Sequence, residues 1–169
     1  MLFVESDLAG RISDITLYMK KSEFERIVTK TFRGLESRLG FKKGEVMYSN
    51  KSYEMQYHNA TTDVTVHYEL GGEPWVAIAD IKDAENRSTL GWLLVERGIT
   101  KEPAPADAFH SFKLSEKDFA SILERENQQL LEYGMDFING DFSLMPELQK
   151  RAKKYALDCK RYIAIHTSK

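Results

Sequence analysis

Two histidines and two glutamates share one side of an alternating segment that runs from residue 53 to residue 70. They are Glu54, His58, His67 and Glu69, and imidazole with carboxylate is a ligand combination that suits zinc. No clustered ligand motif accompanies them. The register that we expect for the two strands lets these side chains meet only diagonally. Hydrogen-bonded side chains on a solvated sheet face are the favoured interpretation, and the sequence predicts no bound metal or other cofactor.

A second pattern combines Asp63 with an acid-x-lysine triplet that begins at Asp80 and ends at Lys82. It is similar to the pattern of restriction-type nucleases, in which two carboxylates hold Mg²⁺ and the lysine orients the attacking water. Asp63 falls in a predicted hairpin loop without the usual preceding proline, and an acid-x-lysine triplet is frequent by chance. Strand-end solvation is the simpler interpretation. A Mg²⁺-dependent nuclease that uses these three residues is the alternative hypothesis.

Glu126 contradicts the pattern around it, because it falls near the middle of the apolar arc of a long predicted helix. Such a carboxylate either points inward with a perturbed pKa or pairs with a base such as Arg151 in the next helix. Pairing or partial exposure is favoured, because buried carboxylates usually have a partner. Cys159 lies on an apolar helix stripe, where a thiol usually behaves as a small hydrophobe. No catalytic residue is predicted, and we expect a protein that is not an enzyme.

Length and composition indicate a compact soluble protein. The chain has 169 residues, of which 42% are hydrophobic and 30% charged, and these values predict a single domain spanning residues 1–169. The single cysteine cannot form an internal disulfide, and no apolar stretch approaches the roughly 20 residues of a membrane helix. We therefore expect a cytoplasmic protein that does not enter a membrane.

Charge is distributed unevenly, although the net charge is only −2. Counting Lys and Arg against Asp and Glu, residues 51–100 carry 4 and 8, residues 101–148 carry 4 and 10, and residues 149–169 carry 7 and 1. The middle of the chain is acidic and its C-terminal part basic. An acidic field repels nucleic acid and attracts basic partners. The C-terminal cations lie outside an apolar stripe, which favours a solvated helix face over a nucleic-acid site.

Predicted helices at both ends of the chain enclose predicted strands in the middle. Ser22 and Glu25 form a capping-box pattern before a helix that ends at Gly40. Residues 1–20 mix two periods and predict a strand or a short helix. The further predicted elements are strands at 45–49, within 53–70 and at 75–81, and helices at 88–97, 115–138 and from 141–146 to 165. The expected inner stripe of the last helix consists of Leu148, Ala152, Tyr155, Ala156, Cys159, Tyr162 and Ile163.

The two central strands are expected to pair with Tyr57 opposite Val66 and Glu54 opposite Glu69, around a four-residue loop at 60–63. Strands in the middle and helices at the ends are typical of an α+β fold. We expect an antiparallel meander of three or four strands packed against several helices, with a C-terminal helical hairpin.

The order of these elements resembles a known group of proteins. A capped helix ending at Leu39-Gly40-Phe41, a meander rich in Tyr and Val, a short Leu-rich helix and a helix pair joined by 139–142 follow one another. This layout resembles small uncharacterised bacterial proteins, some of which look like immunity proteins of contact-dependent or polymorphic toxin systems. The resemblance implies a cytoplasmic protein that binds one toxin domain and blocks it, with no shared catalytic residues.

Two surfaces are candidates for contact with such a partner. One is the polar sheet face, and the other is the outer side of the long helix, where acidic residues would speed the capture of a basic nuclease toxin. We expect neither nucleic acid nor membrane as a partner, and a non-catalytic regulatory subunit is a further alternative. The predicted partner-binding residues are Glu54, His58, His67, Glu69, Glu124, Gln128 and Glu132.

Overall fold

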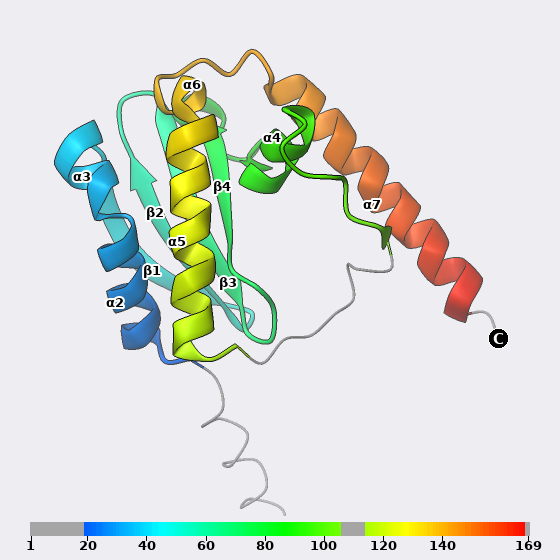
Figure 1. Ribbon diagram of the computed structural model, residues 1–169, viewed down its shortest axis with the longest axis horizontal. Coiled ribbons are helices and arrows are strands. Elements are labelled where there is room, and N and C mark those ends of the chain that lie inside the picture. Colours follow the sequence, from blue (N-terminus) through cyan, green and yellow to red (C-terminus); the bar gives the residue numbers. More distant parts are fainter. Residues whose placement is uncertain (1–18, 106–113, 168–169) are drawn as a thin grey trace, which may run out of the picture.

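The computed structural model describes residues 19–105 and 114–167, and Figure 1 shows their arrangement. The predictions for residues 1–18 lie outside these ranges. The described elements are α2 (Lys21–Thr31), α3 (Arg33–Leu39), β1 (Lys42–Ser49), β2 (Ser52–His58), β3 (Thr62–Glu69), β4 (Trp75–Asp80), the 3-10 turn η1 (Ile81–Asp83), β5 (Ser88–Thr89), α4 (Leu90–Glu96), α5 (Glu116–Tyr133), α6 (Met135–Ile138) and α7 (Met145–Thr167).

The fold is α+β, as the order of predicted elements indicated. The strands form one antiparallel sheet in the order β1-β2-β3-β4-β5, and α2 and α5 lie over one of its faces (Figure 1). The fifth strand, which was not expected, contains only Ser88 and Thr89. These two residues were predicted as the first turn of a helix, and they pair instead with the edge of β4 before α4 begins at Leu90.

Alternation in β2 and β3 places every second side chain in the core. Tyr57 of β2 and Val64 and Val66 of β3 are completely buried. The helices supply large aromatic rings to the same core: Phe24 of α2 stacks on Tyr53 with ring centroids 5.3 Å apart, and Phe119 of α5 meets the edge of Tyr68 at 4.9 Å. Aromatic pairs with this geometry add to the gain from apolar burial. The sheet and its two covering helices therefore share one core.

The register of the central hairpin differs from the expected one by two residues. Tyr57 pairs with Val64, Glu54 pairs with His67, and the connecting loop has three residues, 59–61. The Asn59 side chain closes this tighter loop, because its Oδ1 accepts hydrogen bonds from the backbone N–H groups of Thr61 and Thr62 at 2.9 and 2.7 Å. A shift of two residues leaves every side chain on its predicted face, but it changes which side chains are neighbours.

Two predicted helices are interrupted. The helix expected from Ser22 to Gly40 divides at Phe32 into α2 and α3, and the helix expected at 115–138 divides at Gly134 into α5 and α6. A Cβ atom on Gly134 would lie 2.8 Å from the carbonyl oxygen of Leu130 and 2.9 Å from its Cδ1. The chain turns at Gly134 because only glycine leaves room for that approach.

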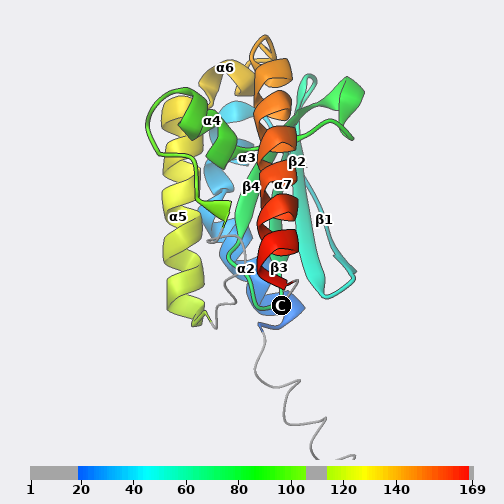
Figure 2. The same cartoon turned by 90° about the vertical axis from the view of Figure 1, so that its right-hand side faces the viewer.

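The prediction of a C-terminal helical hairpin is wrong, because α7 packs against α4 and β5 and does not return along α5 (Figures 1 and 2). An edge contact between the rings of Trp92 and Tyr155 supports this packing, with ring centroids 5.2 Å apart. Of the expected inner stripe only Leu148 is buried, whereas Ala156 and Ile163 are exposed. The second half of α7 therefore extends away from the sheet.

Gly134→Ala is expected to lower the free energy of unfolding by about 1–3 kcal/mol, because the new methyl group must displace the Leu130 backbone or side chain. Urea denaturation measures the change. Gly91→Ala is the control, since its Cβ would meet only Thr89 Oγ1 at 3.7 Å and alanine is the better helix former. Equal effects of the two substitutions would contradict the steric explanation for the helix break.

Candidate functional site

Glu54 and His67 form a direct pair on the polar face of the sheet. The distance between His67 Nδ1 and Glu54 Oε1 is 2.9 Å, and the ring of His67 stacks on Trp75 with centroids 4.3 Å apart. Because a carboxylate only accepts hydrogen bonds, Nδ1 of His67 is the donor. The His67 side chain is only 15% exposed and that of Glu54 27%. The expected pairing of Glu54 with Glu69 is wrong, since Glu69 lies opposite Ser52.

Arg87 contacts this pair from the β5 edge of the sheet. Its Nη1 lies 3.8 Å from Glu54 Oε2, although Arg87 directly precedes β5 and Glu54 belongs to β2. Three polar-face residues of the strands between them, Thr65, Ala77 and Ala79, are small and no more than 2% exposed. We infer that the long Arg87 side chain crosses over these small residues. We had expected this face to meet water or a partner, but its centre is closed by the protein's own side chains.

The other predicted residues of this face lie apart from that cluster. His58 is half-buried at the far end of β2, where it pairs with Asp63 of β3, and Glu69 is exposed at the end of β3. The diagonal approach of His58 and His67 does not bring them together, because each has a different cross-strand neighbour. Within 19–105 and 114–167, no three His, Cys, Asp or Glu residues are grouped closely enough to hold a metal ion.

The residues of the nuclease hypothesis are separated by the sheet itself. Asp63 lies in β3 rather than in a loop, and its Oδ1 accepts a 2.8 Å hydrogen bond from the Thr65 hydroxyl on the polar face. Asp80 pairs with Thr62, whose side chain is on the opposite, helix-covered face. Asp80 accepts a hydrogen bond from the backbone N–H of Lys82 at 2.9 Å and so begins the η1 turn. Two carboxylates on opposite faces cannot bind one Mg²⁺ ion.

Glu126 points from α5 toward the start of β4. Burial raises the pKa of its carboxyl group from 4.5 to about 7; Glu73 adds to the increase, while Arg125 and the backbone N–H of Val76 oppose it. Pairing with Arg151 is wrong, because Arg151 binds Glu96 at 2.7 Å and Glu102 at 3.2 Å. Glu126 is half-buried, so the expected partial exposure is confirmed, and its raised pKa agrees with the alternative of an inward carboxylate. Its hydrogen bond from Val76 gives it a structural role at the edge of the sheet.

The outer side of α5 carries the remaining predicted residues. Glu124, Gln128 and Glu132 are all exposed and follow one another at helical spacing. The opposite side of the helix is fixed in the core by Phe119, Leu123 and Leu130, which are completely buried. We call the exposed residues Glu124, Gln128 and Glu132 the α5 ridge. No hydrogen bond or ion pair joins the side chains of Glu124 and Gln128 to another described residue.

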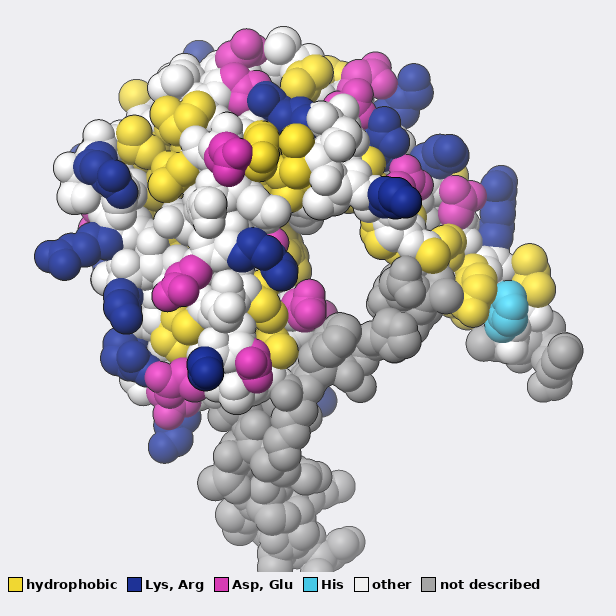
Figure 3. Space-filling view, viewed as in Figure 1, with side chains coloured by type: hydrophobic (Ala, Val, Ile, Leu, Met, Phe, Trp, Pro, Cys, Tyr) yellow, Lys and Arg dark blue, Asp and Glu magenta, His cyan; other side chains and the backbone are white. Residues whose placement is uncertain are grey.

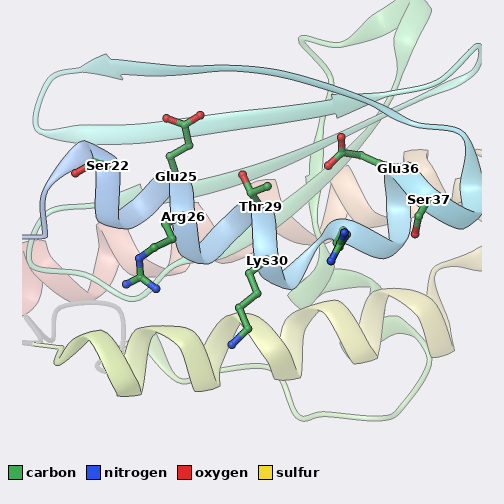
Figure 4. A pocket seen from close by; sticks show the side chains of 8 residues that line it. Ser22, Glu25, Arg26, Thr29, Lys30, Glu36 and Ser37 are labelled. Atoms are coloured by element: carbon green, nitrogen blue, oxygen red, sulfur yellow. The ribbon is translucent and has the colours of Figure 1, made fainter.

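A shallow groove runs along α2 and α3, and its charged groups do not converge. Figure 4 shows Glu25 and Glu36 directed toward the sheet, whereas Arg26 and Lys30 are directed toward α5. Glu25 binds Lys43 of β1 at 3.7 Å, and Arg26 forms an ion pair with Glu116 of α5. Glu25 and Arg26 therefore connect α2 to β1 and α5.

Arg87 and Trp75 belong to the polar-face cluster but were missed in the sequence. Nothing local marks Arg87, which precedes a predicted helix. The only available signal was the small size of Ala77 and Ala79, which alternate with the large core residues Val76 and Ile78. Small residues in the middle of a sheet face leave space for a long side chain from a neighbouring strand.

No helix in the described part of the chain is long and apolar enough to cross a membrane. Comparisons with protein-family models, with curated proteins and with solved structures gave no match.

The Glu54–His67 pair is expected to contribute about 1 kcal/mol of coupling energy, because both side chains are largely buried and hydrogen-bonded. A double-mutant cycle with Glu54→Ala and His67→Ala in urea denaturation measures it. The control cycle uses Glu147→Ala and Lys150→Ala, whose exposed ion pair has a distance of 3.8 Å. Coupling no larger than in the control cycle would contradict the structural role of the pair.

Glu126 is expected to make the protein less stable as the pH rises from about 4.5 to about 7. The folded-state pKa is raised above the unfolded value, so the folded protein binds the proton more tightly, and this stabilisation is lost as the carboxyl ionises. Glu126→Gln therefore increases stability by about 2 kcal/mol at pH 8 and changes it little at pH 4.5.

Thermal or urea unfolding across this pH range measures the effect. Glu124→Gln is the matched control, since that side chain is exposed on the same helix. If both variants show the same dependence on pH, Glu126 is not the titrating group.

Proposed function

We propose that this chain is a non-enzymatic binding protein of the immunity type, which neutralises a toxin domain by docking through the α5 ridge. The observation that carries the proposal is the combination of exposed, unpaired Glu124 and Gln128 side chains with a helix fixed firmly in the core. A helix backbone that is already held in the core loses little freedom on binding, which favours affinity. The position of Asp63 and Asp80 on opposite faces argues against the nuclease alternative.

The α5 ridge is favoured over the polar sheet face because its side chains are available. Glu54 already accepts a hydrogen bond from His67 and forms an ion pair with Arg87. Docking through Glu54 would first require breaking these contacts. Glu132 contacts the hydroxyl group of its neighbour Tyr133, but its side chain is exposed. The side chains of Glu124 and Gln128 form no hydrogen bond or ion pair with a described residue that docking would have to break. A role of Glu54, His58, His67 and Glu69 in partner binding stays a prediction.

The charge of the chain supports a basic partner. Residues 1–148 carry 17 Lys and Arg against 25 Asp and Glu, whereas residues 149–169 carry 7 against 1. Figure 3 shows Lys and Arg side chains along the outer side of α7, away from α5. A net acidic body attracts a basic protein, and the basic α7 repels it from that end. A nuclease toxin with a basic substrate surface is a partner of this chemistry.

The test uses the product of the reading frame next to this gene. Co-expression is expected to restore growth to cells that produce the neighbouring protein, and the two proteins are expected to co-purify. A neighbouring product that is not toxic, or that does not bind this chain, overturns the immunity function. Binding without any effect on toxicity would instead favour the regulatory subunit.

Glu124→Lys is expected to slow association with that partner about tenfold, because it reverses a charge inside the docking surface. Glu85→Lys is the matched control: it makes the same charge change at an exposed position in the loop after η1 and is expected to slow association less than about threefold. Surface plasmon resonance at two salt concentrations measures both rates. Equal effects would indicate long-range attraction alone and would remove α5 from the interface.

A further inference from the structure

Among the described strands, β1 forms one edge of the sheet (Figure 2). Ser49 and Met47 pair with Ser52 and Glu54 across a two-residue turn, so their backbone groups bond to β2. The backbone groups of the alternating residues, Val46 and Tyr48, therefore point away from the sheet. No described residue outside the sheet forms a backbone hydrogen bond with them.

The two halves of β1 differ in the features that prevent pairing with a strand of another molecule. The first half has Lys42, Lys43 and a β-bulge between Lys43 and Val46, and these features are known to prevent pairing with other strands. The second half has none of them. It is an uncharged stretch from Val46 to Asn50, in which Met47 is 49% exposed and Tyr48 57%. The opposite edge of the sheet is short, and α4 and α7 pack against it.

We propose that this half of β1 pairs antiparallel with the same strand of a second copy, forming a symmetric dimer whose two-fold axis passes beside Met47. This proposal is independent of the function proposed above. The edge is self-complementary in the register in which Val46 lies opposite Tyr48 of the second copy. Both residues have outward backbone groups, so they form the hydrogen-bonded pairs on either side of the axis.

The side chains support the same register. The two Met47 side chains meet at the axis in a non-hydrogen-bonded pair, where cross-strand side chains are closest. Glu45, which belongs to the β-bulge, comes next along the strand and lies nearest the uncharged Ser49 of the other copy and not a second glutamate. Shifting the axis to Glu45 would place two glutamates directly opposite each other, which is destabilising. On the helix-covered face, the ring of Tyr48 lies 5.1 Å from Tyr53 and would extend the aromatic row toward the other copy.

Disulfide trapping tests the register in a Cys159→Ser background, which removes the only natural thiol. Met47→Cys is expected to form a cross-linked dimer under mild oxidation, because paired Cβ atoms at this position are near disulfide distance. Tyr48→Cys is the matched control. It places a thiol of similar exposure next to Met47, but its own symmetry mate lies two residues farther along the strand, beyond disulfide reach.

Sedimentation of the full chain without cross-linking tests the dimer itself. A dimer is expected at high protein concentration, with dissociation on dilution, and Met47→Lys is expected to abolish it because two like charges would meet at the axis. Ile165→Lys makes the same change at an exposed residue of α7 and is expected to leave the dimer intact. A monomer at every concentration, or equal cross-linking of Met47→Cys and Tyr48→Cys, overturns the proposal; the first result would leave the edge open to a strand of a different protein.

Discussion

Burial of the alternating apolar side chains of β2 and β3 beneath α2 and α5 is the constraint on which the rest of the structure depends. Tyr57, Val64 and Val66 have no contact with solvent, and Phe24 and Phe119 fill the space between the sheet and the helices. Since successive side chains in a strand point to opposite faces, this burial also determines what lies on the other face. The polar face, the α5 ridge and the free edge at β1 all follow from this one packing arrangement.

The polar face shows how a folded protein satisfies such a constraint. Half-buried charges are unfavourable unless they have partners, and Glu54 has two, His67 and Arg87. Small residues between them provide the space for Arg87. Glu126 meets the same requirement less completely: among the described residues, the backbone of Val76 and the charge of Arg125 favour its ionised form, but burial still raises its pKa. The polar side chains of Glu54, His67 and Arg87 therefore stabilise the fold through contacts with one another.

Surfaces without internal partners are the places where this protein can meet another molecule. The α5 ridge offers exposed polar side chains on a helix that packs into the core, and the second half of β1 offers backbone groups that bond to no described residue, beside the exposed side chains of Met47 and Tyr48. These surfaces differ in chemistry, one being electrostatic and the other based on backbone hydrogen bonds. Binding a basic partner at α5 and a second copy at β1 would use different sides of the sheet assembly and need not compete.

The sequence by itself determined the α+β class, the central strands and the faces of their side chains, because period-two alternation and helix-capping signals are local. It also singled out Glu126, whose position in an apolar arc breaks that local pattern. The register, the break at Gly134, the packing of α7 on α4 and the contact of Arg87 with Glu54 were decided only by the tertiary structure. Each depends on residues distant in the chain or on the space available around one atom. Alternation predicts which way Glu54 points, but only the turn at Asn59 decides that His67 lies opposite it.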